Sequence, residues 1–194
     1  MSTALRKPMT LEEFLAWEEC QELRYEFDGF QPVAMTGGSF AHERIGFTLR
    51  ALLYNALRSK PCDVLGPTLK VEVASRIRYP DAFVFCKEPP PNTNVAREPV
   101  VIFEILSPST SYTDRIEKLR EYRATPSVQR YVILEQDRIA ATIYNRSGDI
   151  WTVQTLLAGD MLEMPEIDVT LALADIYADV KLSADTKDES SQGI

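Results

Sequence analysis

Apolar residues recur at helical spacing in two segments near the start of the chain. Thr10 followed by Glu13 is the pattern of a capping box, and it predicts a short helix over residues 10–20. A longer helix is expected from an N-cap at Ser39 up to Pro61, because proline cannot continue a helix. The apolar positions of the longer helix are Ile45, Leu49, Leu52, Leu53, Ala56 and Leu57.

Alternating polar and apolar residues predict short β-strands between and after the helices. Residues 24–36 alternate around Asp28-Gly29, a dipeptide that favours a tight hairpin turn. The Pro-rich stretch 88–99 predicts a surface loop, because proline donates no hydrogen bond within a central strand. Further strands are expected at residues 63–65, 68–73, 81–86, 130–134, 139–144 and 151–157.

One predicted strand is apolar along nearly its whole length. Residues 100–106 have the pattern of a strand covered on both faces, interrupted only by Glu104. After it, Asp114 followed by Glu117 predicts the start of a helix that ends before Pro126. The apolar side of this helix is expected to consist of Ile116, Leu119 and Tyr122.

The end of the chain is expected to hold a helix over residues 171–178 and a frayed polar tail over residues 183–194. No internal repeat divides the sequence, so residues 1–182 are predicted to form one domain. The order of helices and strands favours an α/β fold, in which helices flank a mixed central β-sheet preceded by an N-terminal helix and a β-hairpin.

Composition and charge narrow the class of protein. The 194 residues are 45% hydrophobic and 26% charged, which excludes a disordered or collagen-like chain. The net charge of -8 repels a phosphate backbone at long range, so any contact with nucleic acid must be local. No apolar run reaches the roughly 18 residues of a membrane span, and the first ten residues lack the apolar segment of a signal peptide. We therefore expect a protein without membrane contact.

The three cysteines, Cys20, Cys62 and Cys86, are odd in number and lack C-x-x-C spacing. This pattern suggests neither a disulfide framework nor a zinc ribbon. A reducing cytoplasm is the expected location.

Glu104 is the chemical anomaly of the sequence. An ionised carboxylate in a doubly covered strand is costly unless a cation, a metal or several donors compensate it. Asp81 follows Pro80 at the start of another apolar strand, and adjacent strands would bring the two carboxylates together. Such a pair, completed by water and phosphate oxygens, suits Mg²⁺ or Mn²⁺. The structural alternatives are a salt bridge from Glu104 to an internal Arg or Lys, and a turn or cap role for Asp81.

Several short motifs stand in one order along residues 10–180. They are Tyr25-Glu26-Phe27-Asp28-Gly29, Ala41-His42-Glu43-Arg44-Ile45, Pro80-Asp81, the string E-I-L-S-P-S-T from Glu104 to Thr110, Asp114-Arg115, and Lys118-Leu119-x-x-Tyr122-Arg123. In this order they resemble the Uma-type endonuclease family, a branch of the PD-(D/E)XK restriction-endonuclease-like superfamily. The resemblance implies a restriction-endonuclease-like fold and metal-dependent hydrolysis of phosphodiester bonds in nucleic acid, with DNA as the expected substrate.

The resemblance also implies roles for individual residues. Asp81 and Glu104 would bind Mg²⁺ or Mn²⁺, and a lysine would orient the attacking water or stabilise the developing charge. The superfamily's usual lysine position, two residues after the glutamate, is Leu106 here. Lys118 in the following helix is the leading replacement, and Lys70 is the other candidate. The structural alternative for Lys118 is a solvated helix residue paired with Asp114.

Glu26 is assigned as the additional catalytic carboxylate that many members of the superfamily supply from the N-terminal element. As a hairpin residue, it is equally well suited to pair with an arginine on a neighbouring strand. The family's acidic residue after Asp28-Gly29 is Phe30 in this sequence. His42 is expected to be neutral near the positive end of its helix, either in the site or as a packing residue.

A locally basic stretch offers phosphate contacts. Arg115, Arg120 and Arg123 are the predicted substrate-binding residues, and Lys118 and Arg130 belong to the same stretch. Glu117 and Glu121 are interleaved with it, so an ordinary solvated helix face is the alternative.

The sequence thus favours a homodimeric endonuclease, since cutting both strands of a duplex suits two-fold symmetry. One alternative is a catalytically inactive or regulatory protein of the same fold. Another is a metal-dependent hydrolase of a different phosphoester.

Overall fold

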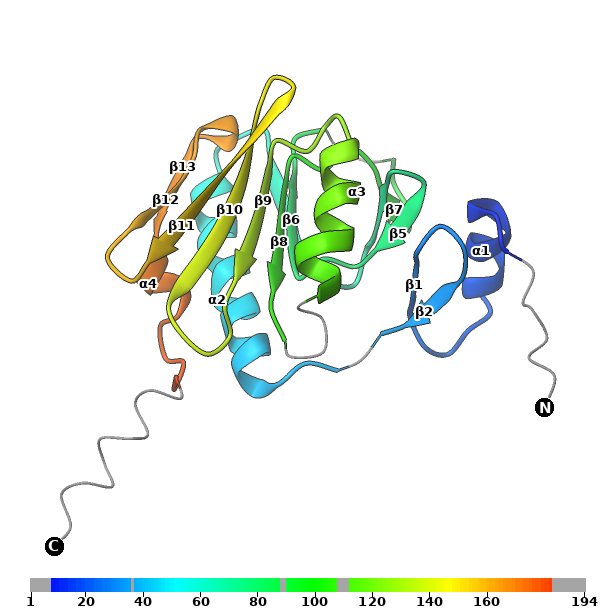
Figure 1. Cartoon of the computed structure of the whole chain (residues 1–194), viewed down its shortest axis with the longest axis horizontal. Helices are drawn as coiled ribbons and strands as arrows, with labels where there is room; N and C mark the ends of the chain where they lie inside the picture. Colours follow the sequence, from blue (N-terminus) through cyan, green and yellow to red (C-terminus); the bar gives the residue numbers. More distant parts are fainter. Residues whose placement is uncertain (1–7, 36, 88–89, 108–111, 183–194) are drawn as a thin grey trace, which may run out of the picture.

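The computed structural model describes residues 8–35, 37–87, 90–107 and 112–182. The C-terminal tail predicted over residues 183–194 lies outside the described residues, as do residues 108–110 of the E-I-L-S-P-S-T motif. The mixed α/β architecture expected from the sequence is present (Figure 1).

A six-stranded mixed sheet forms the centre of the molecule. Only β8 and β9 run parallel within it, and the other neighbouring strands are antiparallel. In order across the sheet, the strands are β11 (Ile150–Leu157), β10 (Ala140–Ser147), β9 (Arg130–Leu134), β8 (Val101–Ile105), β6 (Ala82–Phe85) and β3 (Asp63–Leu65).

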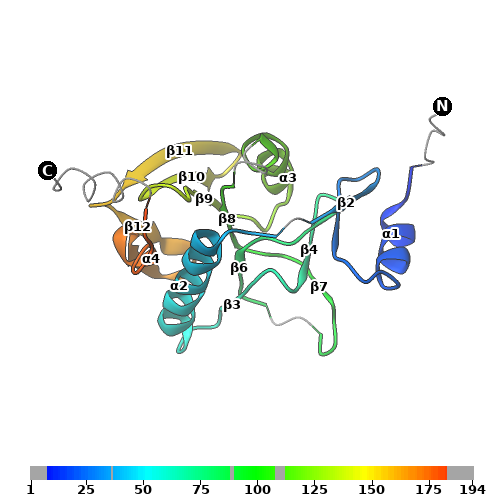
Figure 2. The same cartoon turned by 90° about the horizontal axis from the view of Figure 1, so that it is seen from below.

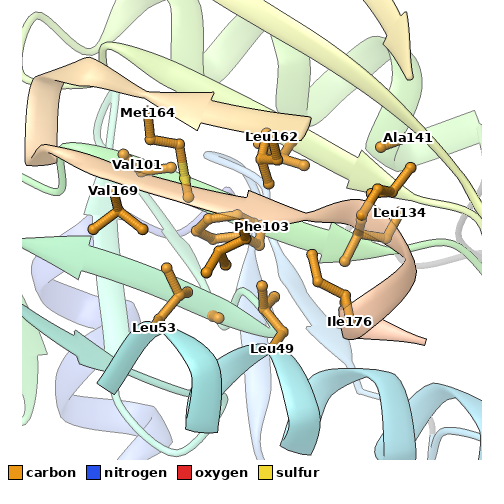
Figure 3. Close-up of a cluster of buried hydrophobic side chains, with 14 of the residues drawn as sticks. Leu49, Leu53, Val101, Phe103, Leu134, Ala141, Leu162, Met164, Val169 and Ile176 are labelled. Atoms are coloured by element: carbon orange, nitrogen blue, oxygen red, sulfur yellow. The ribbon is translucent and has the colours of Figure 1, made fainter. Parts of the chain in front are cut away.

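Helices α2 (Phe40–Leu57) and α3 (Leu119–Ala124) cover opposite faces of this sheet (Figures 1 and 2). The side chain of Ser39 caps α2 by accepting a hydrogen bond from the amide of His42. Leu49 and Leu53 of α2 pack with Phe103 of β8 in the larger core cluster (Figure 3). The predicted long helix and doubly covered strand therefore form the two sides of one core.

A second, five-stranded sheet carries the N-terminal part of the chain. Helix α1 (Leu11–Glu18) packs against this sheet, where Phe14 shares a buried cluster with Phe27 and Ile77, and its Thr10–Glu13 capping box is formed as predicted. In order across the sheet, the strands are β2 (Pro32–Ala34), β1 (Tyr25–Phe27), β5 (Arg76–Arg78), β4 (Lys70–Val73) and β7 (Val95–Ala96). The hairpin expected around Asp28-Gly29 is β1–β2.

Two of these strands were missed by the sequence analysis. β5 follows β4 through a turn in which Ala74 and Ser75 have positive φ angles of 47° and 61°. Neither residue is a turn former of the Gly or Asn type, so the sequence contains no hairpin signal there. β7 lies within the stretch predicted as a loop, where it pairs in parallel with β4.

The C-terminal region differs from the predicted helix over residues 171–178. A two-stranded hairpin, β12 (Met161–Met164) and β13 (Val169–Ala172), with the 3₁₀ turn η2 (Pro165–Ile167) between its strands, precedes a single helical turn, α4 (Leu173–Ile176). Leu162, Met164 and Ile176 join the core under α2 (Figure 3). Of the buried apolar residues in the predicted helix, Leu171 belongs to β13, whereas Leu173 and Ile176 belong to α4.

The helix predicted to start at Asp114 begins as a π-helix, η1 (Thr113–Lys118), which continues into α3. Asp114 does not cap it, because no side chain caps η1 and the carboxylate of Asp114 is buried. Ile116 is 56% exposed, so it is not part of the buried side formed by Leu119 and Tyr122. Because a π-helix has more residues per turn than an α-helix, the positions that face the sheet differ from those that regular α-helical spacing predicts.

A disulfide joins Cys62 before β3 to Cys86 after β6. This corrects the inference from cysteine number, because the antiparallel pairing of β3 with β6 places the two residues opposite each other. Cys20 is a free, exposed cysteine. None of the described helices is both long and apolar enough to cross a membrane.

Candidate active site

A pocket of about 260 Å³ lies where β1, the start of α2, β6, β8 and η1 approach one another. Its lining includes all four residues predicted to be catalytic, which are Glu26, Asp81, Glu104 and Lys118. A larger pocket of about 640 Å³ lies at the other end of α2, beside Cys62, and none of the four lines it. The smaller pocket is therefore the candidate site.

The two predicted metal ligands are brought together by strand pairing. Ala82 of β6 pairs with Phe103 of β8, and extending this antiparallel register by one residue places Asp81 opposite Glu104. Oδ2 of Asp81 accepts a hydrogen bond of 2.7 Å from the amide of Ile105. Asp81 is thus fixed by the strand that carries Glu104, and a turn or cap role alone does not describe it.

Glu104 is buried, with 4% of its surface exposed. Its Oε1 atom accepts hydrogen bonds from Lys118 Nζ at 2.8 Å and from the Tyr122 hydroxyl at 2.9 Å. Burial raises the pKa of Glu104 well above its usual value; Lys118 opposes this shift, but the charges of Asp114, Asp81 and Glu26 add to it. The internal salt bridge considered for Glu104 therefore exists within the candidate site.

Lys118 lies among three carboxylates. Its Nζ is 2.8 Å from Glu104 Oε1, 3.0 Å from Asp114 Oδ1 and 3.5 Å from Glu26 Oε1. Burial alone would lower the pKa of Lys118, but Glu104, Glu26 and Asp114 outweigh it and raise the pKa well above its usual value. The alternative of a solvated helix lysine is wrong, because only 5% of Lys118 is exposed.

Lys70, the other candidate lysine, lies elsewhere. It forms a buried ion pair of 2.6 Å with Glu18 of α1 and does not line the pocket. Of the two lysines, Lys118 is the one that reaches Glu104.

Glu26 lies in the pocket and also pairs with an arginine on a neighbouring strand, so both arrangements considered for it are present. It lines the pocket, and its Oε2 atom is 2.9 Å from Arg78 on the neighbouring strand β5. Burial favours the neutral acid, but Lys118, Arg78 and a hydrogen bond from the Tyr79 amide lower the pKa of Glu26. Glu26 is therefore held as an anion beside Lys118.

Arg78 connects the site to α3. Its guanidinium, 2% exposed, donates two hydrogen bonds of 2.7 and 2.6 Å to Glu121, besides its bond to Glu26. The bidentate geometry fixes the orientation of the Glu121 carboxylate. Glu121 is buried too, so it does not belong to the solvated helix face that was the alternative for this stretch.

His42 belongs to the pocket, with Nε2 at 3.3 Å from Asp81 Oδ2. Burial would lower the pKa of His42, but Asp81, through its hydrogen bond and charge, and Glu43 raise it. The pKa of His42 is therefore shifted in the direction opposite to the one expected from the helix start, because Asp81 and Glu43 favour the charged imidazole.

The predicted substrate-binding arginines do not line the pocket. Arg115 forms an ion pair of 2.5 Å with Glu135, whereas Arg120 and Arg123 are exposed. Arg130 of the same stretch is buried in an ion pair with Glu166. The basic stretch thus divides into two exposed arginines and residues already committed to internal pairs.

The residues of the pocket fit a hard divalent cation by the chemistry of their donors. Asp81 and Glu104 each accept their hydrogen bonds through one carboxylate oxygen, and the other oxygen of each is the one that would bind the cation. No group of three or more His, Cys, Asp or Glu side chains in the described part of the chain has the geometry of a complete metal site. Two carboxylates completed by water and phosphate oxygens are a coordination that Mg²⁺ accepts.

Sequence reasoning missed two residues of this cluster, whereas the pairing of Asp114 with Lys118, considered as the structural alternative for that lysine, is present. Arg78 was not singled out, because strand β5 was not predicted. Tyr122 was assigned only to the apolar side of its helix, and nothing in the spacing indicates that its hydroxyl reaches Glu104.

Comparison with known proteins places the chain in a family. It is 32% identical over 170 residues to the uncharacterized protein slr1290 of Synechocystis sp., covering 86% of this chain and 90% of that one. It is 28% identical to a second Synechocystis protein, sll1609, over 84% of this chain and 96% of that one.

A solved structure shares the fold. The crystal structure described as a "putative nuclease belonging to DUF820" from Anabaena variabilis matches with a TM-score of 0.74 and 18% identity, over 88% of this chain and 98% of that one. The sequence pattern of the family described as "Uma2: Putative restriction endonuclease" matches residues 11–174. The chain therefore belongs to the Uma2 family of restriction-endonuclease-like proteins.

Proposed function

We propose that this protein is a metal-dependent endonuclease that hydrolyses phosphodiester bonds of nucleic acid, with DNA as the substrate. The observation that carries the proposal is the meeting of Asp81, Glu104 and Lys118 in one pocket from three separate elements. Membership of a family described as restriction endonucleases supports the same reaction class.

In this proposal Asp81 and Glu104 hold Mg²⁺ or Mn²⁺. The bound cation lowers the pKa of water and neutralises charge on the phosphate oxygens. The Ile105 amide fixes Asp81, so the donor is positioned before the cation arrives. Lys118 supplies a buried positive charge beside Glu104, where it stabilises the negative charge that develops on the phosphate. Glu26 keeps the ammonium on the side of the pocket formed by β1.

The proposed substrate contacts are to phosphate through Arg115, Arg120 and Arg123. Arg120 and Arg123 are exposed and need no rearrangement, whereas Arg115 must leave Glu135. Contacts of this kind make binding fall steeply with salt concentration and carry little sequence preference.

The proposal includes a homodimer and a cytoplasmic location. Two-fold symmetry presents one site to each strand of a duplex. In the cytoplasm, Cys62 and Cys86, which form a disulfide in the structure, would be kept as thiols, because that compartment is reducing. Light scattering of the purified protein tests the dimer, and thiol alkylation in freshly lysed cells tests the location.

Cleavage assays test the proposed activity. Wild-type protein with Mn²⁺ is incubated with single- and double-stranded DNA and with RNA. Lys118→Met is expected to lower the cleavage rate by roughly 100-fold while Mn²⁺ still binds, because Lys118 acts on charge present only in the transition state. Lys87→Met is the matched control, since Lys87 is an exposed lysine paired with Glu98.

A non-catalytic binding protein of the same fold is the second candidate. The observation that favours it is the internal pairing of Lys118 with Glu104, which satisfies both charges without a metal. Absence of cleavage of every substrate with Mn²⁺ across the pH range would favour this candidate over the nuclease.

A further inference from the structure

Asp114 is the carboxylate of the cluster that has no function in the proposal above. It is 1% exposed on η1, and its backbone carbonyl is fixed by a hydrogen bond of 2.9 Å from the Tyr131 hydroxyl. Its Oδ1 atom lies 3.0 Å from Lys118 Nζ and has no hydrogen-bond partner among the described residues. A buried carboxylate oxygen that depends on one ammonium is costly to keep, so its contact with Lys118 is the feature to explain.

The other two partners of Lys118 have competing attachments. Glu104 also accepts a hydrogen bond from Tyr122, and in the proposed function it holds the divalent cation. Glu26 is also bound by Arg78. Once a divalent cation occupies Glu104, it weakens the attraction of that carboxylate for Lys118 and repels the ammonium. Among the described residues, Asp114 is then the partner of Lys118 that has no second cation beside it.

The local backbone supports this pairing. Asp114 and Lys118 stand four residues apart on the π-helix, which directs both side chains toward the pocket they line. Single π turns occur frequently at functional sites, because they redirect side chains that a regular helix would turn away.

We propose that Asp114 is a positioning residue, which holds the Lys118 ammonium in the pocket when a divalent cation takes Glu104. This inference rests on the proposed function, because it assumes that Glu104 is a ligand. Asp114 contacts neither the cation nor the substrate in this account. It gives Lys118 a second carboxylate, so that metal and ammonium occupy the site together.

Calorimetric titration with Mn²⁺, in the absence of substrate, tests the inference. Asp114→Asn is expected to weaken Mn²⁺ binding by about 10-fold, since Lys118 then depends on Glu104 and competes with the metal. In the Lys118→Met background, the same Asp114→Asn change is expected to alter Mn²⁺ affinity by less than about twofold, because no ammonium competes. Asp114→Glu, which keeps the charge, is expected to restore most of the lost affinity.

The outcomes separate this inference from the proposed function. A wild-type protein that binds no Mn²⁺ overturns both. Wild-type binding that is unchanged by Asp114→Asn, or a loss of equal size in both backgrounds, overturns the role of Asp114 alone. Should Asp114→Asn fail to fold, the Lys118→Met protein and the double variant still give the second comparison, because the double variant removes both members of the Lys118–Asp114 pair together.

Discussion

The two faces of strand β8 show how differently one strand can be buried. Toward α2, Val101, Phe103 and Ile105 join a cluster made of apolar side chains alone (Figure 3). Toward α3, Ile102 and Leu106 join a second apolar cluster, but Glu104 stands beside them and binds Lys118 and Tyr122. Close packing on the first face requires only side chains of matching shape and volume. The second face also requires an ion-pair or hydrogen-bond partner for each buried charge.

This difference separates stability from function within one element. Burial of the α2 face stabilises the fold through the hydrophobic effect, and many apolar residues of similar volume would serve there. On the α3 face, an apolar replacement for the ion pair would be at least as favourable for folding. The buried charges therefore favour the proposed function of the pocket over a purely structural role.

The largest expected effect comes from breaking the charged network at Arg78. Arg78→Met is predicted to reduce the free energy of unfolding by about 5 kcal/mol, because it leaves Glu26 and Glu121 buried without their main cation. Urea unfolding measures the loss. Arg76→Met is the control, since Arg76 also contacts Glu121 but is more exposed and should cost much less. Equal losses in the two variants would show that the network does not depend on Arg78.

Truncation of the apolar face is expected to cost slightly less. Phe103→Ala is predicted to reduce the free energy of unfolding by about 4 kcal/mol through lost burial and the cavity left behind. Stabilisation of the folded variant by Mn²⁺ should persist, because no ligand is removed. Loss of the Mn²⁺ response in a folded Phe103→Ala protein would show that the two faces are not separable.

The neighbouring position on the other face gives the smallest predicted change in stability. Glu104→Gln is expected to alter the free energy of unfolding by less than about 1 kcal/mol, since Lys118 keeps Asp114 and Glu26. Repulsion among the carboxylates, which raises the pKa of Glu104, is relieved at the same time. A loss comparable to that of Phe103→Ala would mean that Glu104 is primarily a structural residue.

The contrast also explains what the sequence could and could not predict. Apolar periodicity was sufficient to predict α2, because burial of one helix face dictates the spacing of residues such as Leu49 and Leu53. A nearly unbroken apolar run was sufficient to predict β8, which is buried on both faces. The anomaly of Glu104 and the family motifs were sufficient to select four residues that line the pocket, Glu26, Asp81, Glu104 and Lys118. Local pattern did not reveal β5 or the π-helix, since a turn without glycine and a widened helical turn are set by tertiary contacts. The position of Arg78 in the network was missed for the same reason.

The most direct test of the central claim, that Asp81 and Glu104 bind a divalent cation, is the melting temperature with and without Mn²⁺. Wild-type protein is predicted to melt at a higher temperature with Mn²⁺, because a ligand that binds only the folded state stabilises it. Asp81→Asn is predicted to abolish this shift, although its side-chain oxygen can still accept the Ile105 amide hydrogen bond. An equal Mn²⁺ shift in wild type and Asp81→Asn, or no shift in the wild type, would contradict the account.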